Sequence, residues 1–399
     1  MSDTDSISAM RSSKPEPVSD VFDHETSSVE PDLCTSGKLN SAAFDFRSDF
    51  VTEPTPSMLN APVLSSLEHD WEEDPTTTSL QKFMADLTSK PAALLVVSGT
   101  AGNQICLRAA LPAPPHSTLA HHHGHIVTME VGAVSSVSGS MVKTVIPAAG
   151  AGEPLSLTDV MENATVTDAV YDCPTRVISL EVPLNGVITT LSNVRAISGW
   201  ARLQTPPIHM HLDGARLWEA VAAGAGSLPE YCAEFDSICL CFSKGLGAPM
   251  GSVIVGSQSF VKRARVIRKL MGGGMRQSAV IAAPARVAVE DTFLGGALAA
   301  AHAKAHRISV MWEKLGGRLH LPTHTNMVWL DLDAANVTKE EFWRVAKEEG
   351  IKVMLKGRIV VHYQISEEAI RRLIIVMHRV LHQRINLAGV KRTAADISE

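Results

Sequence analysis

Short apolar runs recur along this chain and alternate with longer stretches whose apolar residues are spaced three and four apart. Such runs are typical of strands buried on both faces, and the stretches between them are typical of helices that cover a sheet. The alternation predicts an α/β fold with a mostly parallel sheet, in which a ligand binds at the carboxyl ends of the strands. The predicted strands are 92–97, 176–180, 208–212, 237–241 and 252–255.

The pattern changes after Gly295 and Gly296, where a long alanine-rich helix is expected from about Ala297 to Leu315. Short strands and two more helices follow it, which predicts a smaller α+β domain. The strands are expected near 327–332, 352–355 and 359–363, and the helices near 339–349 and 367–384.

We expect four segments: a disordered tail over 1–42, a large domain over 43–296, a small domain over 297–385 and a flexible tail over 386–399. The first segment is rich in Ser, Asp, Glu and Pro and carries few large apolar side chains. It therefore buries too little surface to offset the entropy of ordering. It also lacks the apolar stretch of a secretory signal.

Composition narrows the class of protein. With 45% apolar residues among 399, the chain can build a large core, and a net charge of −6 favours neither a nucleic acid nor a membrane surface as partner. No apolar stretch is long enough to span a bilayer. The six cysteines form no CxxC pair, and Cys106, Cys239 and Cys241 lie in apolar runs, as reduced thiols do. These features predict a cytoplasmic protein.

Two charged residues come directly after predicted strands. Lys244 follows 237–241 and is flanked by small residues, and Asp213 follows 208–212. Taken alone, the lysine fits a solvated turn and the aspartate fits a helix N-cap. Together, at the strand ends of an α/β sheet, they suit pyridoxal phosphate, because the lysine forms a Schiff base and the carboxylate keeps the ring nitrogen protonated. We therefore predict an enzyme that acts on amino acids.

Two further motifs bear on this cofactor. Gly99 and Thr100 close a strand and open a helix, where backbone N–H groups can bind a phosphate, although many such junctions are only turns. The histidines at 121, 122, 123 and 125 invite a metal interpretation. Their spacing is crowded and no thiol or carboxylate cluster is nearby, so we predict no metal and favour polar loop residues instead.

The motifs, in this order, resemble the L-threonine aldolases, which are fold type I pyridoxal-phosphate enzymes of the β-eliminating lyase superfamily, and fungal members in particular. The resemblance extends from about Asp45 to about His382. It implies a large domain with a mostly parallel, seven-stranded type of sheet and a smaller C-terminal α+β domain. The segments that carry it include 45–49, 74–76, 98–100, 125–132, 211–216, 243–247, 272–277 and Arg358.

The resemblance also implies roles for individual residues and a homotetramer of two dimers with shared active sites. The catalytic residues would be Lys244 as the Schiff-base lysine, Asp213 as partner of the ring nitrogen and His125, which stacks on the ring and handles the β-hydroxyl proton. Further cofactor contacts would come from Gly99 and Thr100 at the phosphate, Arg216 near the ring oxygen, and Lys269 and Arg276 at the neighbouring subunit's phosphate. Ser48, Arg216 and Arg358 would bind the substrate carboxylate.

The implied reaction is cleavage of L-threonine, L-allo-threonine or a related β-hydroxy-α-amino acid to glycine and an aldehyde, in threonine catabolism and glycine biosynthesis. Phe50, Glu53 and Val182-Pro183 depart from the family pattern at the site rim, so a different substrate or a different reaction at Cα stays open. One alternative is an amino-acid racemase acting on alanine in secondary metabolism. The other is an inactive binding subunit, against which the intact Lys244 and Asp213 argue.

Overall fold

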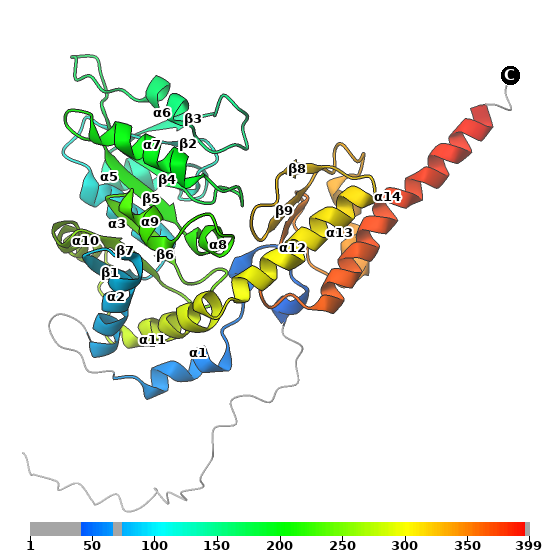
Figure 1. Cartoon of the computed structure of the whole chain (residues 1–399), viewed down its shortest axis with the longest axis horizontal. Coiled ribbons are helices and arrows are strands. Elements are labelled where there is room, and N and C mark those ends of the chain that lie inside the picture. The colour runs from blue at the N-terminus through cyan, green and yellow to red at the C-terminus, as the bar shows by residue number, and fades with distance from the viewer. Residues whose placement is uncertain (1–40, 67–73, 396–399) are drawn as a thin grey trace, which may run out of the picture. The chain divides into compact units, whose positions relative to one another are not determined.

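A seven-stranded sheet is the centre of the larger part of the chain (Figure 1). The fold is described from a computed structural model, which covers residues 41–66 and 74–395, with side chains up to residue 382. The tail predicted over 1–42 lies outside these ranges except for its last two residues. Of these, Ala42 is buried, and the boundary at 42/43 stays a prediction.

The sheet has the strand order β1-β7-β6-β5-β4-β2-β3, and only β7 runs antiparallel to its neighbours. Because the other six strands point the same way, their carboxyl ends meet at one edge. The predicted mostly parallel α/β sheet is confirmed. Its strands are β1 (Ala92–Val96), β2 (Ser117–His121), β3 (Met141–Val145), β4 (Thr175–Glu181), β5 (His209–Gly214), β6 (Ser237–Cys241) and β7 (Ser252–Gly256).

Helices pack against both faces of this sheet. One face is covered by α3 (Gly99–Ala110), α5 (Ala133–Ser138) and α10 (Gln258–Leu270). The other face is covered by α2 (Pro75–Thr88), α6 (Leu157–Asn163), α7 (Leu191–Arg202) and α9 (Leu228–Ala233). The remaining helices of this part of the chain are α1 (Pro56–Asn60), α4 (His125–Thr128), α8 (Leu217–Ala222) and α11 (Ala279–Ala288).

Local sequence explains where several helices begin. Asp74 precedes Pro75 and accepts a hydrogen bond from the Thr77 N–H, and Ser98 does the same for Ala101. Side chains that accept from these free N–H groups are favoured N-caps, and proline suits the first helical position.

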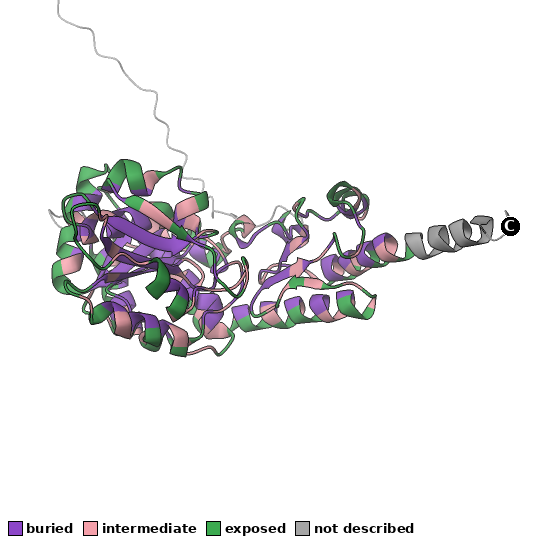
Figure 2. Cartoon of the chain, turned by 90° about the horizontal axis from the view of Figure 1, so that it is seen from above, coloured by how far each residue is buried: buried purple, intermediate pink, exposed green. Residues whose placement is uncertain are grey.

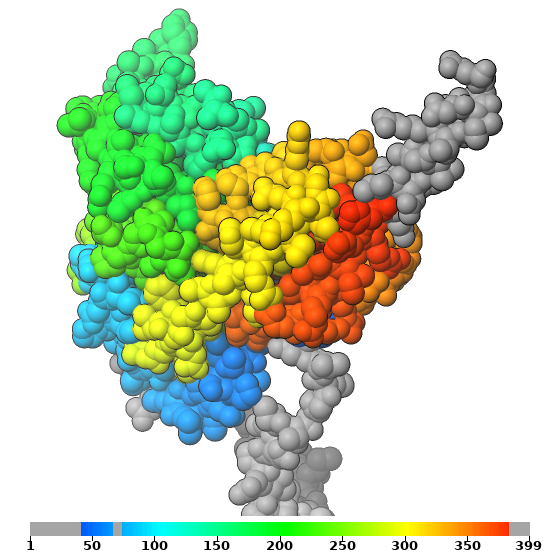
Figure 3. All heavy atoms as spheres, turned by 45° about the vertical axis from the view of Figure 1, so that its right-hand side comes forward, coloured from blue at the N-terminus to red at the C-terminus, as the bar shows by residue number. Residues whose placement is uncertain are grey.

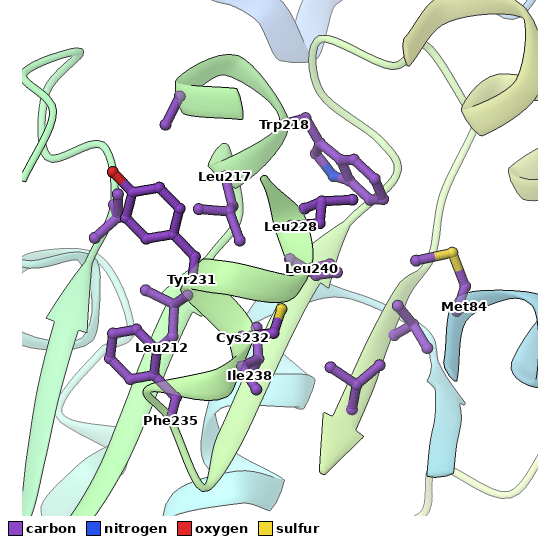
Figure 4. Packing of buried hydrophobic residues seen from close by; sticks show 14 of the residues in the cluster. Met84, Leu212, Leu217, Trp218, Leu228, Tyr231, Cys232, Phe235, Ile238 and Leu240 are labelled. Carbon is purple, nitrogen blue, oxygen red and sulfur yellow. The ribbon is translucent and has the colours of Figure 1, made fainter. Parts of the chain in front are cut away.

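The main core lies between the sheet and the helices. Every residue of β6 and β7 is buried, and the strands are almost wholly purple in Figure 2, whereas the helices turn green faces outward. Figure 4 shows Leu212 and Ile238 from neighbouring strands packing with Tyr231 and Phe235 of the α9 region. This two-sided burial accounts for the continuous apolar runs in the sequence.

A second core belongs to the C-terminal part of the chain. Its sheet is antiparallel, in the order β10-β9-β8. Figure 3 shows the yellow residues of α12 on the surface, between green residues of the larger part of the chain and the orange and red residues that follow α12 in sequence. The elements are α12 (Ala297–Lys314), β8 (Leu319–Leu321), β9 (Met327–Leu330), α13 (Lys339–Glu348), β10 (Arg358–Val360) and α14 (Glu367–Ala395). The predicted strand over 352–355 is wrong, because only Lys352 makes a bridge there.

Residues 41–52 join the two cores, and we call them the N-terminal strap. Phe46 packs in the second core, its N–H donates to the Lys352 carbonyl, and its own carbonyl accepts from the Val360 N–H. Further along, the Thr52 hydroxyl donates to the Lys244 carbonyl at 2.9 Å. The strap therefore ties the small sheet to the edge where the large sheet's strands end.

The described residues belong to one compact unit, so the division at 296/297 stays a prediction. The predicted start of a C-terminal tail at 386 falls inside α14. Within the part of the chain that the structure covers, no helix is long and apolar enough to cross a membrane.

Candidate active site

Lys244 and Asp213 meet at the carboxyl edge of the large sheet. Asp213 lies near the end of β5, and Lys244 comes three residues after β6, its parallel neighbour. Both side chains line a cavity of about 120 Å³. Its complete lining is Gly99, Thr100, Asn103, His125, Asp213, Ala215, Cys241, Ser243 and Lys244. The structure thus brings together five residues that were predicted at 99, 100, 125, 213 and 244.

The first turn of α3 forms one wall of this cavity. Ser98 caps Ala101, and the N–H groups of Gly99 and Thr100 precede any helical carbonyl that could accept from them. Gly102 lets the helix lie close to β6, since a Cβ at this position would be 2.3 Å from Cys239 Sγ. The free N–H groups therefore lie at the end of the helix that borders the cavity, where an anion is favoured.

His125 is held by two carboxylates. Its Nδ1 lies 2.7 Å from Glu130 Oε1, and its backbone N–H donates to Glu181 Oε2 at 2.8 Å. The hydrogen bond with Glu130 is the main reason that the pKa of His125 is raised above its usual value, against burial of the ring, which lowers it. The imidazole is thus both fixed in orientation and made more basic.

Asp213 is oriented by neutral donors. Its Oδ2 accepts from Asn103 Nδ2 at 2.7 Å, and its Oδ1 accepts from the Ala215 N–H at 3.1 Å. The carboxylate is 4% exposed, and no lysine or arginine makes an ion pair with it in the described chain. A protonated ring nitrogen would supply the missing positive charge.

Glu181 is a third carboxyl group at this edge and pairs in register with Asp213. Burial and the nearby charge of Asp213 raise the pKa of Glu181 to about 7. This group can therefore hold a proton near neutral pH, which makes it a second titrating element beside His125.

Arg216 contacts the strap rather than pointing freely into the cavity. Its Nε and one terminal nitrogen donate to the two oxygens of Asp49 at 2.7 and 2.6 Å. Burial alone would raise the pKa of Asp49, but the charge and hydrogen bonds of Arg216 outweigh it and lower the pKa to about 2. The pair is bidentate, which fixes the plane of the guanidinium group.

Arg358 lies beside this ion pair with spare hydrogen-bonding capacity. One terminal nitrogen donates to the Arg47 carbonyl at 3.1 Å, whereas the buried Nε has no hydrogen-bond partner among the described residues. Burial and the neighbouring Arg216 both lower the pKa of Arg358. Two guanidinium groups thus face one carboxylate, Asp49, and the excess positive charge suits a substrate carboxylate. Ser48, the other predicted carboxylate ligand, is buried next to Asp49.

Lys269 and Arg276 are not part of the cavity. They line a separate space of about 970 Å³ along α10, together with Lys262, Arg265 and Arg268. Their predicted contact with a neighbouring subunit's phosphate stays a prediction.

The neighbouring histidines stand apart from the catalytic arrangement. His121, His122 and His123 bring ring nitrogens within 4.8 Å of one another. Both nitrogens of His121 are already engaged, because Nδ1 accepts from the His123 N–H at 2.9 Å and Nε2 lies 3.1 Å from the Glu153 carbonyl. The cluster therefore lacks a free third ligand.

Four site residues were missed as functional candidates: Asp49, Asn103, Glu181 and Ser243. Asp49 follows the predicted Ser48, and Ser243 precedes Lys244, so proximity in sequence was an available signal for these two. Glu181 directly follows the predicted strand 176–180, so the signal that pointed to Asp213 was available for it as well. Nothing in the sequence pairs Asn103 with Asp213, because that contact joins distant segments.

The donor set fits pyridoxal phosphate. An amine, a carboxylate without a cationic partner and the start of a helix line one cavity, and these are the groups that can bind its aldehyde, ring nitrogen and phosphate. The buried Arg358 Nε adds an unoccupied donor for an amino acid's carboxylate.

Comparison with known proteins agrees with this chemistry. The family model described as "Beta-eliminating lyase" matches residues 45–335. Aldolase vrtJ of Penicillium aethiopicum is 52% identical, over 92% of this chain and 96% of that protein. Alanine racemase TOXG of Cochliobolus carbonum is 40% identical, over 86% and 89%. A low-specificity L-threonine aldolase of Candida albicans is 38% identical, over 82% and 87%.

A solved structure has the same fold. The threonine aldolase of Leishmania major superposes with a TM-score of 0.72 at 19% identity, covering 85% of this chain and 99% of that one. The predicted fold type I architecture is thereby confirmed. The family match also agrees with the predicted cofactor, pyridoxal phosphate, and confirms the predicted enzyme class. The chain belongs to the β-eliminating lyase family.

Proposed function

We propose that the chain is a pyridoxal-phosphate-dependent aldolase that cleaves a β-hydroxy-α-amino acid, such as L-threonine or L-allo-threonine, to glycine and an aldehyde. The observation that carries this proposal is His125, whose ring is held by Glu130 at 2.7 Å and lines the same cavity as Lys244 and Asp213. Cleavage of this bond needs a base for the β-hydroxyl proton, and a histidine with a raised pKa suits that task. The names of the two aldolase relatives support the same reaction.

The residues that would hold the cofactor are those of the 120 Å³ cavity. Lys244 would attach it covalently, Asp213 would keep the proton on its ring nitrogen, and the N–H groups at Gly99 and Thr100 would bind its phosphate. When bound, pyridoxal phosphate supplies a ring that accepts the electron pair of the broken Cα–Cβ bond.

The substrate contacts would come from the strap and the small domain. Arg358 and Ser48 would bind the α-carboxylate, with Arg216 held beside them by Asp49. His125 Nε2 would take the β-hydroxyl proton while Nδ1 stays bound to Glu130. Fixing the carboxylate and the hydroxyl at the same time places the scissile bond in one orientation.

An alanine racemase is the second candidate, because a relative with that name is 40% identical over most of both chains. The site rim also differs from the usual aldolase pattern, and Phe50 at this rim is 65% exposed. Racemisation needs exchange of the Cα proton but no base for a β-hydroxyl group.

We also propose a homotetramer built from two dimers. Several apolar side chains of the described chain are strongly exposed, among them Val63 at 80%, Leu64 at 87% and Val131 at 99%, as expected of an interface. In such an assembly Lys269 and Arg276 would contact the partner's phosphate. Light scattering of the purified protein tests the subunit number.

One substrate panel tests the reaction. The enzyme is incubated in deuterated water with L-threonine, L-allo-threonine, phenylserine, and L- and D-alanine, and aldehyde, glycine and chiral alanine are measured. The aldolase proposal predicts aldehyde from at least one β-hydroxy substrate, lost with Lys244→Ala together with the visible absorbance of the bound cofactor. Inversion of alanine with deuterium at Cα and no aldehyde would favour the racemase and reject the aldolase.

A further inference from the structure

We propose that Asn103 is a positioning residue that joins Asp213 and the Glu130–His125 pair into one hydrogen-bonded unit. This inference rests on the function proposed above, since it assigns the two ends of the unit to cofactor and substrate. Asn103 lies near the start of α3, is 1% exposed, and lines the cavity with Lys244.

The Asn103 amide nitrogen donates to both carboxylates. Nδ2 lies 2.7 Å from Asp213 Oδ2 and 3.0 Å from Glu130 Oε1. The same Glu130 oxygen accepts from His125 Nδ1 at 2.7 Å. An amide carries two N–H donors, and both are used here. A continuous chain of hydrogen bonds therefore runs from Asp213, which would bind the cofactor's ring nitrogen, to His125, which would act as the base toward the substrate.

His211 fixes the orientation of the Asn103 amide from the side opposite the two carboxylates. Its oxygen lies 3.2 Å from His211 Nε2, and His211 Nδ1 lies 2.9 Å from the Ser237 hydroxyl. Burial lowers the pKa of His211 to about 4, so the ring is neutral and carries one proton. Because Nδ2 faces two carboxylates and the amide oxygen can only accept, the hydrogen bond between that oxygen and His211 assigns the ring proton to Nε2. The reversed amide would place its oxygen against two carboxylates, which is unfavourable.

Of the two adjacent amides, only Asn103 donates to both carboxylates. Its neighbour Gln104 is also buried and donates to Glu130 Oε2 at 2.6 Å, but it makes no contact with Asp213. Gln104 therefore donates only to Glu130, whereas Asn103 donates to Glu130 and Asp213. Substitutions at the two positions can thus distinguish an effect on Asp213 from an effect on Glu130.

Removal of the shared amide should have two consequences at once. Asp213 would lose one of the two donors that fix the orientation of its carboxylate, and a misaligned carboxylate holds the ring nitrogen less well. Glu130 would lose a donor that competes with His125, so its interaction with the imidazole would strengthen. The first effect weakens cofactor binding, and the second moves the acidic limb of the pH–rate profile to higher pH.

The experiment compares Asn103→Leu with the control Gln104→Met in the full-length protein. Two quantities are measured: the dissociation constant of pyridoxal phosphate for the apoprotein, by fluorescence titration, and the acidic limb of kcat on whichever substrate the wild type turns over. Asn103→Leu is expected to weaken cofactor binding about tenfold or more, the effect of a lost hydrogen bond to a charged group, and to shift the acidic limb upward. Gln104→Met is expected to shift the limb alone.

Two results would overturn the proposal: a cofactor dissociation constant for Asn103→Leu within about twofold of wild type, or equal weakening by Gln104→Met. Circular dichroism checks folding, and Asn103→Ala, which leaves room for water, replaces the leucine variant where that variant does not fold. A wild type that turns over none of the panel substrates would reject the proposed function, whereas the comparison of dissociation constants would still decide the role of Asn103.

Discussion

The buried ion pair between Asp49 and Arg216 gives a sharp prediction for the variant Asp49→Asn. The Asp49 side chain is completely buried, the Arg216 side chain is 16% exposed, and two hydrogen bonds of 2.6 and 2.7 Å join them. The substitution keeps the size of the side chain but leaves the guanidinium charge without its carboxylate.

The size of the effect can be worked out in two ways. The pKa of Asp49 falls from 3.8 to about 2, and this difference corresponds to about 2 kcal/mol of folding free energy. Removing one partner of a buried pair usually costs about 3–5 kcal/mol, because the remaining charge is buried without compensation. We therefore expect Asp49→Asn to lose at least about 2 kcal/mol of stability.

Asp45 provides a matched control in the same strap. Asp45 is also buried, but its partner Arg47 has a side chain that is 48% exposed, so water can solvate the charge that Asp45→Asn leaves and the loss should be smaller than for Asp49→Asn. Urea denaturation at equal protein and saturating cofactor concentrations measures both variants. Since the pKa of Asp49 is lowered, its contribution is complete above the unfolded value of 3.8 and disappears only as the pH falls towards 2. The difference between wild type and Asp49→Asn should thus be constant from about pH 6 to 8. Equal losses for the two variants, or a difference that titrates in this range, would refute the reasoning.

Three further predictions concern groups around the cavity. Glu130→Gln removes the charge and the hydrogen bond that raise the pKa of His125, so the acidic limb of kcat should move to lower pH, and an unmoved limb would reject His125 as the base. The pKa of Glu181 is raised from 4.5 to about 7, so the ionised carboxylate destabilises the fold increasingly as the pH rises through this interval. The melting temperature of Glu181→Gln should therefore rise relative to wild type between pH 5 and pH 8. An equal difference in melting temperature at both pH values would contradict this. Arg358→Lys should raise KM for the amino acid about tenfold or more, through the lost bidentate contact, with little change in cofactor binding, and an unchanged KM would exclude Arg358 from the carboxylate site.

The sequence did not predict the strands β2, β3 and β8. β2 is buried at every position, yet it contains Ser117 and Thr118. Their hydroxyl groups are satisfied by partners in distant segments, since Thr118 lies 2.9 Å from Ser140 Oγ and Ser117 lies 3.2 Å from Thr175 Oγ1. β3 was missed for a different reason, because it is an edge strand and is largely exposed. Apolar periodicity predicts strands only where burial alone determines the residue type.

The site shows the same division. Lys244 and Asp213 could be predicted because each lies near the carboxyl end of a predicted buried strand, and parallel strands bring such positions to one edge. The ion pair between Asp49 and Arg216 could not be predicted, since the two residues are 167 positions apart in the sequence. They come into contact only because the strap runs between the two sheets. Long-range hydrogen bonds of this kind leave no periodic trace in the sequence.

The path of the strap has a practical consequence for anyone who shortens this protein. A recombinant version that starts at Asp74, the N-cap of α2, would keep Lys244 and the whole seven-stranded sheet with its helices, yet it would lose Ser48 and Asp49 and uncover the backbone of Lys352 and Val360. Such a fragment should still take up the coloured cofactor but should handle amino acids poorly and tend to aggregate. Affinity tags and cleavage sites therefore belong upstream of Ser41.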